Sequence, residues 1–160
     1  MLLLAERLAI TAHSGQLDKA GIEYWRHPMR VAFMVSGDQE RQVAWLHDVL
    51  ENTTYTADDL VRYGFSDHVV KAVELLTKHK GTRLDDYYAR IRENDLARTV
   101  KLADVADNLN PERLALLDAN TQQRLRGKYI RALLALGALD VPAVALDAFD
   151  RGDICDLSMI

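Results

Sequence analysis

Polar side chains interrupt two apolar helical patterns in this chain of 160 residues. His47 completes an apolar stripe that begins at Val43 with helical spacing, and Asp48 follows it directly. In the segment DLARTVKLADVADN, Asp104 extends the stripe of Val100 by one helical turn. A carboxylate on the buried face of a helix costs several kcal/mol unless a cation compensates its charge. The two interruptions therefore need a common explanation.

A divalent cation is the explanation that fits these residue types. Two carboxylates that face one interior repel each other, and a bound cation converts this repulsion into binding. Imidazole together with carboxylate is a ligand set for Mn, Fe, Zn or Mg rather than for softer metals. His27 offers a further imidazole, at the expected N-cap of a helix that Pro28 opens. A lone buried histidine or aspartate is usually structural, so the prediction rests on the combination.

The elements that must position these residues are predicted to be helices. Apolar residues repeat with helical spacing along most of the chain, and no segment alternates convincingly with the period of a strand. The chain has 8 Gly and 3 Pro, and this low content of turn formers favours long helices. We expect an all-α fold of about eight or nine helices. The expected ranges are 2–14, 28–36, 39–51, 56–63, 66–79, 84–94, 95–108, 111–118 with 120–138, and 141–149.

Length and charge narrow the class of protein. A chain of this length is expected to form one domain, residues 1–160. The net charge of −4 argues against a protein that binds nucleic acid by neutralising phosphates. A basic cluster on the late helix is interpreted as a solvated face, with the alternative that part of it lines a substrate groove. The cluster consists of Arg124, Arg126, Lys128 and Arg131.

The ends of the chain and its cysteine content bear on location. Cys155 is the single cysteine, which favours a reducing compartment. The apolar run in MLLLAERLAI is too short and too interrupted for a signal peptide, and no stretch is long enough to span a membrane. We expect a cytoplasmic protein without a membrane partner. The acidic residues from Asp140 onward are interpreted as a solvated end.

The pair His47-Asp48, with His27 before it and Asp104 after it, resembles the HD-domain metal-dependent phosphohydrolases. The likeness extends to four segments: AHSGQLDKAGIEYWRHP, AWLHDVLENT, LLTK and VKLADVADN. Together they resemble the alarmone hydrolase domain of the Rel/SpoT family, and its single-domain members, the small alarmone hydrolases, most of all. The resemblance implies a single-domain, HD-type helical bundle, in agreement with the periodicity.

The resemblance also implies a ligand set and a reaction. His27, His47, Asp48 and Asp104 match the ligands of one divalent metal ion, usually Mn²⁺ in this family. The family reaction removes the 3′-pyrophosphate from guanosine tetra- or pentaphosphate. Glu51 matches an acidic residue near the water that attacks phosphorus.

Three more residues are expected to contact the substrate. Lys19 matches a basic residue that binds phosphates, and Arg26 or Arg30 is expected to assist it in neutralising phosphoryl charge. Asn108 matches a polar residue of the nucleotide pocket. Tyr24 is a large aromatic near the ligands and is a candidate for stacking on the base, with core packing as the alternative.

The chain departs from the family pattern at several positions. Asn52 stands where the family usually has an aspartate beside Glu51, so the catalytic pair has one carboxylate. Asp18 stands where the family often has an arginine, and we expect it to disfavour phosphate on its side. Ala20 replaces a common serine, and His13 matches a frequent family position for which a polar role at a helix end is an equal alternative.

Three functions follow from these matches and departures. The first is a metal-dependent alarmone 3′-pyrophosphohydrolase. The second is an HD phosphohydrolase that acts on another nucleotide or phosphorylated metabolite, which Asp18 favours. The third is a catalytically impaired regulatory protein that binds metal and nucleotide, which Asn52 favours. No pattern in the sequence predicts the oligomeric state.

Overall fold

The all-α fold expected from the periodicity is confirmed. The structure, a computed structural model, describes residues 1–138; the helix expected over 141–149, Cys155 and the acidic segment from Asp140 lie outside the described residues. Within residues 1–138 there is no β-strand, only an isolated antiparallel bridge between Leu17 and Glu23. The helices are α1 (Leu2–Ala12), α2 (Arg26–Phe33), α3 (Asp38–Leu46), α4 (Val49–Asn52), α5 (Ala57–Arg62), α6 (Asp67–Leu76), α7 (Leu84–Arg92), α8 (Asp95–Asn108), α9 (Pro111–Leu114) and α10 (Ala119–Ala135).

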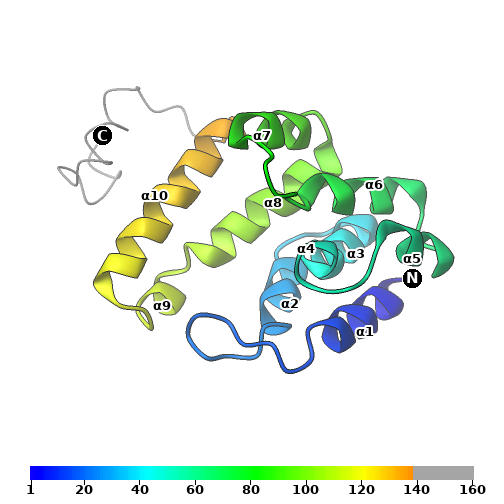
Figure 1. Cartoon of the computed structure of the whole chain (residues 1–160), viewed down its shortest axis with the longest axis horizontal. Helices are drawn as coiled ribbons and strands as arrows, with labels where there is room; N and C mark the ends of the chain where they lie inside the picture. The colour runs from blue at the N-terminus through cyan, green and yellow to red at the C-terminus, as the bar shows by residue number, and fades with distance from the viewer. Residues whose placement is uncertain (139–160) are drawn as a thin grey trace.

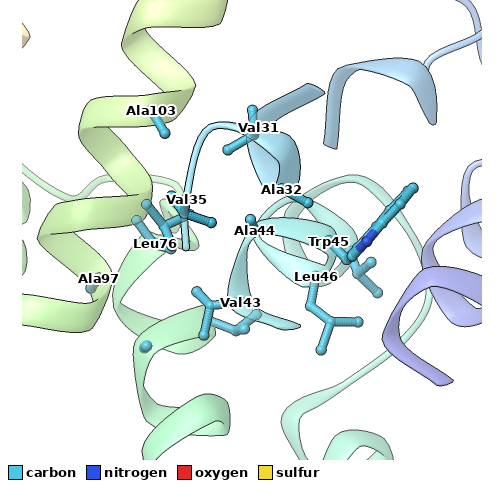
Figure 2. Close-up of a cluster of buried hydrophobic side chains, with 14 of the residues drawn as sticks. Val31, Ala32, Val35, Val43, Ala44, Trp45, Leu46, Leu76, Ala97 and Ala103 are labelled. Atoms are coloured by element: carbon cyan, nitrogen blue, oxygen red, sulfur yellow. The ribbon is translucent and has the colours of Figure 1, made fainter. Parts of the chain in front are cut away.

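Helix α3 is the centre of the bundle. It packs against α1, α2, α6 and α8, and its residues Val43, Ala44 and Leu46 are fully buried. Figure 2 shows side chains of α2, α3, α6 and α8 gathered in this cluster. Helix α10 runs beside α8 at one side of the molecule, and α1 lies toward the opposite side (Figure 1). Helix α3, which His47 and Asp48 follow, and helix α8, which carries Asp104, therefore pack together in the interior.

The prediction of a single helix over 39–51 is wrong, because the helix is interrupted at His47 and Asp48. Helix α3 ends at Leu46 and α4 begins at Val49. The ring of His47 explains the break, since its Nδ1 donates to the carbonyl of Ala44 at 2.7 Å. In a continuous helix that carbonyl would accept from the N–H of Asp48. The histidine thus replaces a helical hydrogen bond with one that fixes its own ring.

The expected start of the second helix is also wrong. His27 is not the N-cap: α2 begins at Arg26, Trp25 is its N-cap, and His27 lies inside the first turn. Pro28 is tolerated there because the first turn of a helix has no internal partners for its N–H groups. The shift buries His27, which is 5% exposed. Its ring can then face the interior rather than the loop.

The segment between α1 and α2 is a compact turn rather than a helix. The N–H of Asp18 donates to the carbonyl of Ile22 at 2.8 Å, and the N–H of Gly21 donates to that of Asp18 at 3.0 Å. Gly21 has a φ of +76°, a region that side chains disfavour. This turn carries Lys19. Over residues 1–138, no helix is long and apolar enough to cross a membrane.

Candidate metal centre

Three helices bring the four predicted metal ligands together. His27 comes from the first turn of α2, His47 follows α3, and Asp104 lies on the inner face of α8. One ligand atom from each of these three residues lies within 4.8 Å of the other two. Asp48 adjoins the cluster, with its Oδ2 3.2 Å from Nε2 of His47 and 3.8 Å from Nε2 of His27.

Both imidazoles present the same nitrogen to the cluster. Nδ1 of His47 donates to the carbonyl of Ala44, and Nδ1 of His27 donates to Oδ2 of Asp107 at 2.7 Å. This leaves Nε2 of each ring as the ligand atom, and Nε2 of His27 lies 3.1 Å from Oδ1 of Asp104. Nε2 of His47 is buried without a hydrogen-bond partner among the described side chains and backbone. An orphaned buried nitrogen beside carboxylates fits a divalent ion.

The charges of the cluster favour ionised carboxylates. Burial alone would raise the pKa of Asp104, but the ammonium of Lys101, 2.8 Å from Oδ2, holds it well below the usual range. The pKa of Asp48 is likewise lowered, because His47 and His27 outweigh the effect of burial. Burial alone would lower the pKa of His27, yet Asp104 and Asp107 raise it to about 9. Without a metal, a proton therefore occupies this site near neutral pH.

Asp107 is a functional candidate that the sequence analysis missed. Its side chain is fully buried and accepts from His27 and from Arg30, whose Nε and Nη2 lie 2.6 and 3.1 Å away. Burial alone would raise the pKa of Asp107, but these partners lower it to about 2. The signal was present, because Val100, Asp104 and Asp107 share one helix face at i, i+4 and i+7. Metal-binding histidines commonly have a carboxylate in this position.

A cavity of about 630 Å³ opens beside the candidate metal ligands His27, Asp48 and Asp104, a volume suited to a nucleotide-sized ligand. Lys128 from α10 lines it, as the alternative interpretation of the basic cluster proposed. Burial lowers the pKa of Lys128, and the neighbouring Lys101 and Lys19 lower it further. The lysines that line the cavity are Lys19, Lys78, Lys101 and Lys128.

Five of the predicted catalytic and substrate residues line this cavity, but they are engaged differently than expected: Lys19, Tyr24, Glu51, Asn52 and Asn108. Oε2 of Glu51 accepts from the backbone N–H of Lys78 at 2.7 Å. The hydroxyl of Tyr24 donates to Oδ2 of Asp48 at 2.6 Å, and Nδ2 of Asn52 lies 3.4 Å from that hydroxyl. Tyr24 therefore supports a candidate ligand. Its stacking on a base stays a prediction.

Asn108 and His13 serve the centre indirectly. Nδ2 of Asn108 donates to Oδ1 of Asp104 at 2.6 Å, one helical turn away. His13 is fully buried, with its Nδ1 2.9 Å from Oε1 of Gln16 and its ring centroid 5.0 Å from that of Tyr24. Asn108 thus holds a member of the cluster, and His13 packs against Tyr24, which contacts Asp48.

Three charged residues do not have the surroundings expected of them. Arg30 is paired with Asp107, and Arg26 is paired with Glu23 at 3.3 Å, so both cations are engaged away from the phosphate position assigned to them. Asp18 does not stand as a free anion, because its Oδ2 lies 3.4 Å from Nη2 of Arg113. Its expected repulsion of phosphate is therefore offset by a cation that also lines the cavity.

Known proteins match this chain both in sequence and in structure. No family model matches the chain. The chain is 35% identical over 116 residues to a guanosine-3′,5′-bis(diphosphate) 3′-pyrophosphohydrolase of Haemophilus influenzae. The match covers 64% of this chain but spans only 17% of that protein's length.

The structural match covers nearly the whole of both chains. It is to a metazoan ortholog of SpoT that hydrolyzes ppGpp and plays a role in starvation responses, with a TM-score of 0.67 and 20% sequence identity. The match covers 95% of this chain and 94% of the other. The structural likeness confirms the HD-type all-α fold, and the sequence likeness confirms that this chain resembles the Rel/SpoT-type alarmone hydrolases.

Proposed function

We propose that this chain is a metal-dependent phosphohydrolase that removes the 3′-pyrophosphate from guanosine 3′,5′-bis-pyrophosphate, with Mn²⁺ as its metal. One observation carries the proposal: Nε2 of His27 and of His47 converge with the carboxylates of Asp48 and Asp104 beside a lysine-lined cavity. The similarity to the Haemophilus influenzae hydrolase supports the choice of substrate.

Different residues of the chain have different roles in the proposed reaction. A divalent ion held by the four ligands would supply Lewis acidity toward water and toward a phosphoryl oxygen. Glu51 faces the same cavity, where its carboxylate can orient the attacking water and accept its proton. Lys19 and Lys128 can neutralise phosphate oxygens. The hydroxyl of Tyr24 holds Asp48 in place.

A second function deserves a test because of Asn52. Its amide can hydrogen-bond water but cannot take a proton, and in this chain it approaches the hydroxyl of Tyr24 at 3.4 Å. Because this amide departs from the paired carboxylates of the alarmone hydrolases, the second candidate is a phosphohydrolase that acts on another nucleotide or phosphorylated metabolite.

A substrate panel with the purified full chain tests the proposal. Guanosine 3′,5′-bis-pyrophosphate, other guanosine and adenosine phosphates, and Mn²⁺, Mg²⁺ or Zn²⁺ are combined, and products are separated by anion exchange. We expect GDP and pyrophosphate from the bis-pyrophosphate, and no product from His47→Ala. Orthophosphate released from a different nucleotide would select the second function. Binding without any product would support the regulatory alternative instead.

A further inference from the structure

The single negative charge of Asp107 is contacted by two positively charged guanidinium groups. Arg30 already donates to both of its oxygens. Arg113 adds a further contact, with Nη1 donating to Oδ2 of Asp107 and, at 3.1 Å, to its backbone carbonyl. Two guanidinium groups thus converge on one buried carboxylate that also binds the candidate ligand His27.

The other end of Arg113 reaches the turn that carries Lys19. Nη2 of Arg113 lies 3.4 Å from Oδ2 of Asp18, a residue 95 positions away in the chain. Oδ1 of Asp18 accepts from the backbone N–H groups of Ala20 and Ile22, at 2.9 and 3.0 Å. The carboxylate of Asp18 therefore closes the turn with one oxygen and binds Arg113 with the other.

These contacts form one continuous path. It runs from the turn through Asp18, Arg113 and Asp107 to the ring of His27. The side chain of Arg113 is 22% exposed and that of Asp18 is 11% exposed, so solvent weakens the path little. The guanidinium group is planar and rigid, and its position at one carboxylate fixes its position at the other.

We propose that Asp107 and Arg113 are positioning residues that hold the ring of His27 and the Lys19 turn in a fixed relation across the cavity. Asp107 sets the orientation of His27 and thereby the metal affinity. Arg113 transmits this placement to the turn, so that metal binding orders the backbone of residues 18–22. Resting on the proposed function, the consequence for catalysis is that Lys19 stands at a set distance from the attacked phosphorus.

The path explains why Asp18 departs from the family pattern. Asp18 stands where a cation is expected, and Arg113 lies against it from α9, so the local charge at the cavity wall is kept near neutral. Asp18 then anchors the turn to α9 through Arg113 rather than repelling phosphate.

Four variants of the full chain separate the roles of these residues. Asp107→Asn removes the negative charge that orients His27. Asp18→Asn removes the ion pair between the turn and Arg113. Arg113→Lys keeps a cation near Asp107, but a lysine cannot bridge both carboxylates. Arg124→Gln changes an exposed arginine of α10 outside the cavity lining and serves as the matched control.

Two measurements need no substrate: Mn²⁺ affinity by calorimetry, and amide hydrogen exchange of residues 18–22 with and without Mn²⁺. In the unchanged chain and in Arg124→Gln, we expect Mn²⁺ to slow exchange at Ala20 and Ile22. Asp107→Asn should weaken Mn²⁺ binding by about 10- to 100-fold. Arg113→Lys and Asp18→Asn should keep Mn²⁺ affinity close to that of the unchanged chain but lose the slowing of exchange.

The proposal is overturned if Arg113→Lys retains the Mn²⁺-dependent slowing, or if Mn²⁺ never slows exchange in the unchanged chain. Unaltered Mn²⁺ affinity in a folded Asp107→Asn variant would also overturn it. If instead the chain hydrolyses no phosphate ester while these results hold, the proposed function fails and the positioning path stands.

Discussion

His27 and His47 offer the same ring nitrogen to one point, but different parts of the chain hold them. The ring of His47, which directly follows α3, is fixed by the carbonyl of Ala44, three residues earlier in the chain. The ring of His27 is fixed by Asp107, a side chain 80 residues away on α8. A backbone contact survives most substitutions, whereas a side-chain contact can be removed by one. The orientation of the His47 ring should therefore tolerate most substitutions, whereas the orientation of the His27 ring depends on one side chain.

Loss of either imidazole should have the largest effect of any change to this centre. His47→Ala and His27→Ala each remove one of the nitrogen ligands, and we expect both to abolish measurable Mn²⁺ binding and hydrolysis. Calorimetry with Mn²⁺ and the product assay are the measurements. His68→Ala, an exposed histidine of α6, is the control and should change neither. Full metal binding in either variant would remove that histidine from the ligand set.

Loss of the proposed acid–base group Glu51 should have the next largest effect. Glu51 and Asn52 belong to α4, which begins directly after the break at His47 and Asp48. Glu51→Gln keeps the shape of the side chain but cannot accept a proton, so we expect kcat to fall by roughly 10²- to 10⁴-fold. Mn²⁺ affinity should be unchanged, and this separates loss of the base from loss of the metal.

Asn52→Asp is the complementary change at the neighbouring position. It supplies the second carboxylate of the family pattern, and we expect faster hydrolysis of the bis-pyrophosphate. Slower hydrolysis of some other phosphate ester by the same variant would instead mark Asn52 as an adaptation to that ester. If neither Glu51→Gln nor Asn52→Asp changes any rate, α4 takes no part in catalysis.

The same contrast explains what the sequence could predict. The sequence singles out His47 and Asp104 because each is a polar residue at a position of an apolar helical stripe, and Asp48 because it directly follows His47. The break between α3 and α4 was missed, because it depends on a ring competing for one backbone carbonyl. The contacts of Asp18 and Arg113 were missed because they join segments far apart in the chain. Hydrophobic periodicity predicts which face of a helix is buried, but not which distant side chain contacts that face.

The affinity for Mn²⁺ should depend on pH because the two histidines bind protons. The pKa of His27 is raised to about 9 by its carboxylate neighbours despite burial, and that of His47 is raised as well. A metal must displace the proton at Nε2, so Mn²⁺ affinity should rise from pH 6.5 to about 9, by about tenfold per pH unit for each proton released. Calorimetry across this range measures the slope. A flat profile would show that neither ring is protonated in the metal-free protein.

Stability of the metal-free protein should change in the opposite direction. A folded-state pKa above the unfolded value of about 6.5 means that protonated His27 stabilises the fold below that pH, and that this contribution is lost as pH rises toward about 9. Thermal unfolding should show Tm falling over this interval without metal, and a growing rise in Tm on addition of Mn²⁺. His27→Gln removes the titrating group and should flatten the first trend.

The smallest effect is expected for the two lysines that are proposed to bind phosphate, because neither fixes a histidine ring. Lys19 is exposed on the turn between α1 and α2, and Lys128 faces the same cavity from α10. If each binds phosphate equally in the ground and transition states, Lys19→Ala and Lys128→Ala should raise KM with little change in kcat. Removal of one solvent-exposed cation should cost roughly 1 kcal/mol or less, a several-fold rise in KM. The double variant should raise KM more than either single variant, because two cations that line one cavity can bind the same polyanion. Unchanged KM in the double variant would place the phosphates elsewhere in the cavity, whereas a fall in kcat alone would assign the lysines to charge that develops only in the transition state.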